Sequence, residues 1–167
     1  MKFAPLHVYS SYSFLKSGLT INKIVSSLKA NDYFGIGISD INVMHGVPEF
    51  AIECEKINKP YIVGMELELD KYFVSLYAKN ETGYLNLSFI TSSIQKGSFN
   101  KEVLLNHSEG LIAVVDTHSG EPFRAFIQEE LTDSFRKSLL DLSKLFNEFY
   151  LGIEISSNED REIAKTI

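Results

Sequence analysis

The chain has 167 residues, a length that allows one domain, or one domain and part of another. Its composition, 44% hydrophobic and 23% charged, is that of a folded protein and excludes disorder, collagen and coiled coil. The formal net charge is −6 with both signs interspersed, which argues against DNA binding by this segment alone. No apolar run approaches the ~18 residues of a membrane span. The absence of a secretory signal and the single cysteine, Cys54, indicate a cytoplasmic protein.

Strands and helices are expected to alternate over the first 70 residues. The pattern predicts a strand from Ala4 to Tyr9, a helix capped by Thr20, and a glycine-containing strand from Tyr33 to Ser39, where backbone approaches closely. A second helix follows, with Val47, Phe50, Ala51, Cys54 and Ile57 on its apolar face and Pro48 in its first turn. The strand Tyr61 to Leu69 comes next. This order indicates βαβ units and a parallel sheet.

The second half continues with less regular spacing. We expect a turn at Asp70 and Lys71, a strand from Tyr72 to Ala78, a helix capped by Thr82, and a buried strand from Gly110 to Val115. A long helix should carry Phe135, Leu139, Leu142, Phe146 and Phe149 on one face, before a strand from Tyr150 to Ile155 and a helix from Glu159 to Lys165. The sequence stops in mid-pattern, so residues 1–167 are interpreted as a domain truncated before its end. An incomplete domain leaves apolar faces uncovered, so we expect self-association.

Three polar residues lie near the ends of predicted strands, where catalytic residues of β/α barrels gather. They are His7, Asp40 and Glu66, whose side chains could hold Zn²⁺ or Mn²⁺. A structural interpretation also fits, with His7 hydrogen-bonded in the core, Asp40 capping a turn or a helix, and Glu66 solvated. Cys54, on an apolar helix face, is read as an inert thiol, and His45 and His107 as surface residues.

Several segments together resemble a known family. The segments LHVYSSYS (6–13), SDINVMHGVPEF (39–50) and KPYIVGME (59–66) are similar to the first three motifs of PHP domains. AKNETGYLNL (78–87), EGLIA (109–113) and FYL (149–151) extend the similarity to the N-terminal PHP domain of bacterial DNA polymerase III alpha subunits. The resemblance implies an α/β fold, a partial distorted β/α barrel of TIM-like type that lacks its last strands and helices.

The chain departs from the metal-binding pattern of that family. Active relatives carry metal ligands where this chain has Tyr9, Ile41, Phe73 and Thr117, with His118 one position away. Isoleucine and phenylalanine cannot bind a metal. The resemblance therefore implies at most a remnant site at His7, Asp40 and Glu66 with weak or absent metal binding, and no catalytic residues in this segment.

The resemblance implies a role within a replicative DNA polymerase, a DNA-directed nucleotidyltransferase that uses Mg²⁺ in a later domain. The segment itself is expected to be a catalytically inert scaffold without a tightly bound cofactor. Its expected partners are the rest of the polymerase chain and replisome proteins, with DNA reached through the parent protein and no membrane. The alternative is a metal-dependent phosphoesterase or 3′–5′ exonuclease that uses His7, Asp40 and Glu66. A free-standing binding module is a third interpretation.

Overall fold

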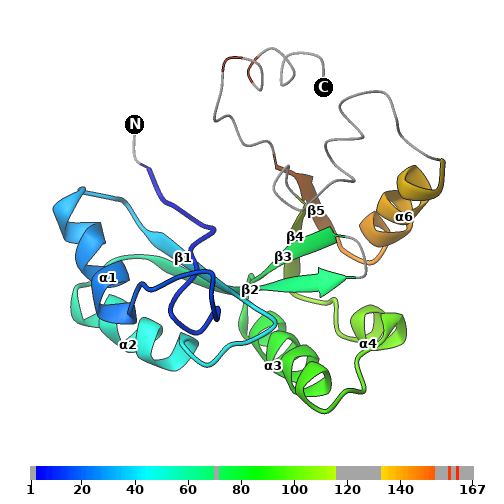
Figure 1. Ribbon diagram of the computed structural model, residues 1–167, viewed down its shortest axis with the longest axis horizontal. Coiled ribbons are helices and arrows are strands. Elements are labelled where there is room, and N and C mark those ends of the chain that lie inside the picture. The colour runs from blue at the N-terminus through cyan, green and yellow to red at the C-terminus, as the bar shows by residue number, and fades with distance from the viewer. Residues whose placement is uncertain (1–2, 70–71, 116–132, 153–157, 159–160, 162–167) are drawn as a thin grey trace.

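The computed structural model describes residues 3–69, 72–115, 133–152, 158 and 161. Five strands form one sheet in chain order, β1 (Ile36–Ile41), β2 (Tyr61–Leu69), β3 (Tyr72–Ala78), β4 (Leu111–Val115) and β5 (Glu148–Leu151) (Figure 1). The helices are α1 (Ile21–Ala30), α2 (Val47–Lys56), α3 (Glu81–Gln95), α4 (Lys101–Asn106) and α6 (Asp133–Ser143). None of these helices is long and apolar enough to cross a membrane.

The sheet is mixed rather than parallel. β1 pairs with β2, and β4 with β5, in parallel, as the βαβ pattern predicts. β3 is antiparallel to both of its neighbours. The reason is the connection, since β2 and β3 are separated only by residues 70 and 71, too few for the crossover that a parallel pair requires.

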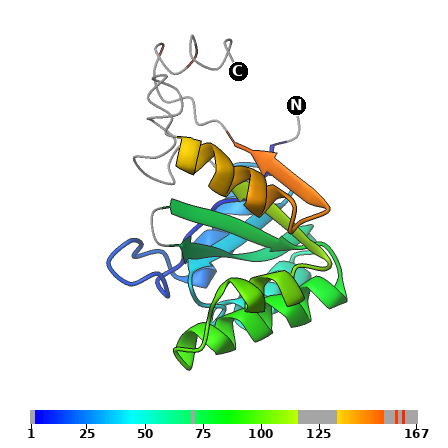
Figure 2. The same cartoon turned by 90° about the vertical axis from the view of Figure 1, so that its right-hand side faces the viewer.

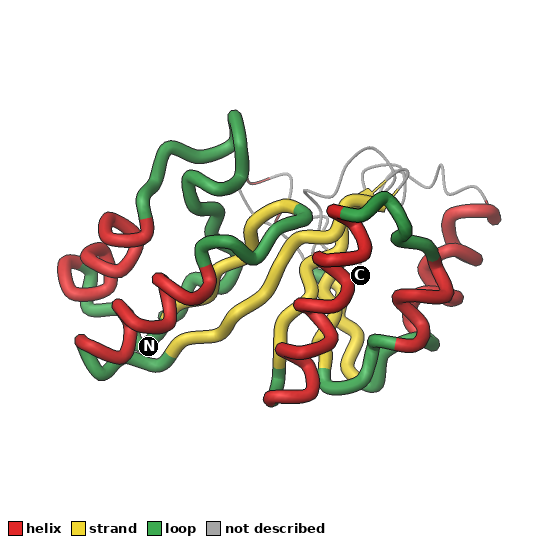
Figure 3. Tube along the Cα trace, turned by 90° about the horizontal axis from the view of Figure 1, so that it is seen from below, coloured by secondary structure: helices red, strands yellow, loops and turns green. Residues whose placement is uncertain are grey.

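One face of the sheet carries the apolar core. Ile36 and Ile38 of β1 pack against α1 and α2, and the next strands contribute Met65, Leu67, Val74, Leu76, Ala113 and Val115 to a second cluster that includes residues of α3, α4 and α6. Figure 3 shows α1 and α2 as a group separate from α3. The opposite face, here called the inner face, carries the buried polar residues Ser39, Glu66 and Ser75.

The predicted strand from Ala4 to Tyr9 does not form. The segment instead runs beside β1, where the carbonyls of Phe3, Pro5 and Val8 accept bonds from the β1 side. The accepting residues are irregularly spaced and Pro5 has no N–H to donate, so no regular ladder develops. The expected close approach at the glycines is confirmed, because a Cβ on Gly37 would lie 2.2 Å from the Leu6 carbonyl oxygen.

Several boundaries in the second half also differ from the predictions. Asn80, rather than Thr82, caps α3 by accepting a bond from the Gly83 amide. The helix α4 was not expected from the sequence. α6 ends at Ser143, so Phe146 lies in the following loop and Phe149 in β5. Thr20 does cap α1, and Pro48 does lie in the first turn of α2. The turn at 70–71, most of the predicted final helix and the segment 153–155 lie outside the described residues.

Candidate functional site

His7 and Glu66 lie together on the inner face. Glu66, 4% exposed, belongs to β2, and His7 comes from the N-terminal segment beside β1. His7 Nε2 is 3.5 Å from Glu66 Oε1, and the Tyr9 hydroxyl donates to Glu66 Oε2 over 2.5 Å. The His7 and Tyr9 rings meet edge to face at 4.8 Å. Tyr9 thus bonds one carboxylate oxygen, and His7 lies within ion-pair distance of the other, which links the N-terminal segment to β2.

Asp40 belongs to a different network. In the register of β1 with β2, Asp40 pairs with Met65 and Ile41 pairs with Glu66. Because side chains alternate along a strand, Asp40 projects from the face opposite to Glu66. The structure therefore brings two of the three predicted residues together and places the third elsewhere.

The Asp40 carboxylate holds the loop after the first motif. It accepts bonds from the Ser10 amide (2.7 Å), the Ser10 hydroxyl (2.6 Å) and the Ser13 hydroxyl (2.6 Å). The Ser13 oxygen in turn accepts a bond from the Ile41 amide. Asp40 is 2% exposed and both serines are buried. A carboxylate with these donors is a structural anchor for the loop.

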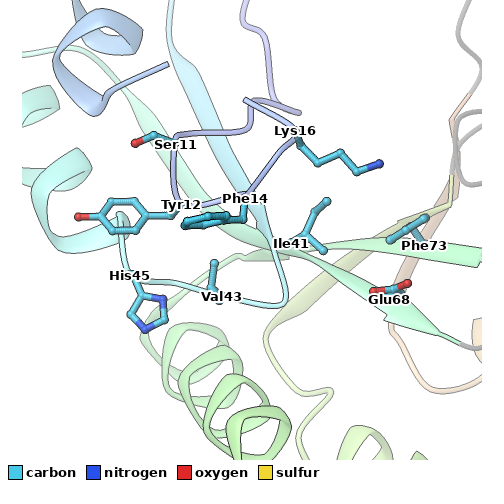
Figure 4. A pocket seen from close by; sticks show the side chains of 9 residues that line it. All are labelled: Ser11, Tyr12, Phe14, Lys16, Ile41, Val43, His45, Glu68 and Phe73. Atoms are coloured by element: carbon cyan, nitrogen blue, oxygen red, sulfur yellow. The ribbon is translucent and has the colours of Figure 1, made fainter. Parts of the chain in front are cut away.

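An open groove of about 730 Å³ lies beside this loop (Figure 4). Its apolar lining comes from Tyr12, Phe14, Ile41, Val43 and Phe73. Lys16 and Glu68 contribute one charge of each sign, and His45 stacks on Tyr12. Two of the lining residues, Ile41 and Phe73, stand at positions where the family resemblance implies metal ligands.

The side chains of the described residues do not form a set of ligands for several metal ions. Among the described residues no group of three or more His, Cys, Asp or Glu side chains is placed to hold a metal. Tyr9 and His7 contact Glu66, the serines bond to Asp40, and Ile41 and Phe73 present only carbon atoms to the groove. Thr117 and His118 lie outside the described residues. Weak or absent metal binding at a remnant site of His7, Asp40 and Glu66 stays a prediction, and no chemical step is derived through it.

The other candidates have structural environments. Cys54 is fully buried, and burial raises the pKa of its thiol to about 11, so the reactive thiolate is disfavoured. His45 is exposed, as expected. His107, expected at the surface, is half-buried, stacks on Phe89 at 3.9 Å and contacts Asn86 Oδ1 at 3.0 Å.

The sequence indicated Tyr9 only as a lost ligand position and predicted no contact of Tyr9, Ser10 or Ser13 with the carboxylates. They are the direct partners of Glu66 and Asp40. The only available signal was the hydroxyl-rich segment YSSYS at residues 9–13, next to a candidate ligand. Hydroxyl groups of this kind serve to satisfy buried carboxylates.

Comparisons of the sequence with known proteins agree on one family. The profile of the PHP domain family matches residues 5–158. The chain is 28% identical to the DNA polymerase III subunit alpha of Bacillus subtilis, with 92% of this chain and 15% of the relative covered. It is 30% identical to that of Borreliella burgdorferi (97% and 16%) and 32% identical to that of Rickettsia felis (91% and 14%). The chain thus spans about one sixth of the length of these relatives.

Solved structures share the fold. A protein described as a metal-dependent phosphoesterase from Bifidobacterium adolescentis aligns with a TM-score of 0.62 at 14% identity, over 98% of this chain and 83% of that one. An amidohydrolase from Chromobacterium violaceum aligns with a TM-score of 0.62 at 13% identity, over 98% and 81%. At this identity the likeness concerns the fold, which is that of a partial TIM-like barrel.

Proposed function

The chain belongs to the PHP domain family, and on that premise we propose that it is a catalytically inert scaffold within a DNA polymerase III alpha chain. Residues 1–167 are the N-terminal part of the PHP domain in this proposal. The parent protein carries out DNA-directed DNA synthesis in the cytoplasm, with Mg²⁺ and the catalytic residues in a later domain. Replisome proteins and DNA are partners of that parent protein.

The scaffold role rests on the contacts that the two buried carboxylates make. Glu66 is engaged by Tyr9 and His7, and Asp40 by Ser10 and Ser13. A phosphoester hydrolase needs ligands that hold the metal and leave a position open for water. Here the same carboxylates fasten the N-terminal segment and its loop to the sheet, which is a structural task.

The test is a hydrolysis assay combined with elemental analysis. Protein purified without chelator should contain less than one equivalent of Zn, Mn or Fe. It should not cleave single-stranded DNA or a chromogenic phosphodiester when Mn²⁺ or Zn²⁺ is added. Two or three bound equivalents, or activity that disappears in both His7→Ala and Asp40→Ala while circular dichroism shows each variant to be folded, would instead establish the metal-dependent phosphoesterase or exonuclease.

The assignment to a polymerase chain has its own test. The reading frame downstream of Ile167 should encode a polymerase domain, because the relatives extend far beyond the region matched here. A frame of about 170 codons would contradict the polymerase assignment and leave the scaffold role of the carboxylates untouched.

A further inference from the structure

The loop of residues 10–19 exposes large apolar side chains. Leu15 is 99% and Phe14 88% exposed, and Tyr12 and Leu19 are 43% and 47% exposed. In Figure 2 this blue loop extends away from the sheet. Lys16 is the single charged residue between positions 10 and 19. Exposed apolar groups gathered in one short loop are typical of a contact surface.

Hydrogen bonds hold the loop in this shape. Asp40 anchors it through Ser10 and Ser13, and the Ser11 amide donates to the Leu19 carbonyl over 2.7 Å, which closes its base. Leu15 has a φ of 61°, a left-handed conformation that is unfavourable for leucine. Such a conformation persists where the surroundings impose it. The loop conformation that exposes Leu15 is therefore defined by its surroundings.

The groove beside the loop is complementary to it. The loop offers an exposed apolar side chain, Leu15, whose neighbours Phe14 and Lys16 line the groove. The groove offers an apolar recess lined also by Ile41, Val43 and Phe73. The patch also carries one cation and one anion, because Lys16 and Glu68 both border the groove. Figure 4 shows these two side chains on the same side of the groove as Phe73.

We propose that a second copy of this chain docks on this surface. A contact with two-fold symmetry places the same patch of both copies face to face, so it needs a protrusion and a recess, and a cation and an anion, on one patch. The 10–19 loop and the groove supply all four. In the dimer Leu15 of each copy enters the groove of its partner, and Lys16 of each copy faces Glu68 of the other. A lone lysine beside a glutamate does not suit nucleic acid, which is bound through several cations.

Analytical ultracentrifugation over a concentration series tests the apolar part. The wild-type chain should show a reversible monomer–dimer equilibrium. Leu15→Asn keeps the backbone conformation accessible, because asparagine tolerates positive φ, and should raise the dimer dissociation constant at least roughly tenfold. The control is Leu85→Asn on α3, which removes a leucine that is 61% exposed and should leave the constant unchanged.

Charge reversal tests the symmetry. Lys16→Glu and Glu68→Lys each place like charges together twice in a homodimer and should both weaken association. An equimolar mixture of the two variants should dimerise again, because each mixed pair restores both opposite-charge contacts. A wild-type chain that is monomeric at all concentrations, a dimer indifferent to Leu15→Asn, or a mixture without recovery would overturn the proposal. Thermal unfolding of each variant confirms that it is folded.

Discussion

Replacing Asp40 separates the anchoring role from a metal role. Asp40→Ala removes the acceptor of three hydrogen bonds with donor–acceptor distances of 2.6–2.7 Å and leaves the buried Ser10 amide and two hydroxyls without it. A bond to a charged group contributes about 1.5–3 kcal/mol, and contributions within one network are not additive. We therefore expect a loss of about 3–5 kcal/mol in the free energy of unfolding, a large part of the total of a typical domain.

Asp40→Asn is a milder substitution, which removes the charge and keeps an acceptor oxygen. Its amide oxygen can still accept the two bonds now made to Oδ1, and the Ser10 hydroxyl can turn to accept from the new amide group. The expected loss is about 1–2 kcal/mol, because the charge is removed and the network is retained. Asp141→Ala, which breaks an exposed pair with Lys144 at 3.3 Å, is the matched control and should cost less than about 1 kcal/mol.

The measurement is urea denaturation followed by circular dichroism, with EDTA and then with added Zn²⁺. The order of stability, wild type above Asp40→Asn above Asp40→Ala, should be the same in both conditions. If Asp40→Ala behaves like Asp141→Ala, or if its defect vanishes when EDTA is present, the carboxylate does not anchor the loop and the reasoning fails.

Two further predictions concern burial. Burial raises the Cys54 pKa from 9.0 to about 11, so folding favours the neutral thiol. The contribution of this thiol to the free energy of unfolding is therefore complete below pH 9 and is lost as pH rises towards 11. Wild type should lose about 2 kcal/mol more than Cys54→Ala between those pH values in urea titrations, and parallel curves would contradict the assignment. Gly37→Ala places a methyl group 2.2 Å from the Leu6 carbonyl oxygen and should cost about 1–3 kcal/mol in thermal unfolding. Gly18→Ala, with open space at its Cβ, should stay within about 0.5 kcal/mol of wild type, and equal effects would refute the close approach.

Local sequence pattern determined much of the helical structure. The apolar spacing of Ile21, Ile24, Val25 and Leu28, with Thr20 before it, predicts α1, and all four side chains are buried. Ordered motifs identified the PHP family, and Ile41 and Phe73 in those motifs predict an incomplete set of metal ligands. The helix and the family inferences succeed because helix periodicity, caps and short motifs are properties of neighbouring residues, whereas the loss of metal ligands stays a prediction.

The relation between the candidate site residues was decided only by the tertiary structure. Whether Asp40 and Glu66 share a face depends on the register of β1 with β2, a pairing between segments separated in sequence. The partners of each carboxylate come from the N-terminal segment, 27–57 residues away along the chain. Hydrogen bonds to Ser10, Ser13 and Tyr9 form only after the backbone has brought these segments together, because sequence spacing carries no information on which distant donors meet a buried acceptor.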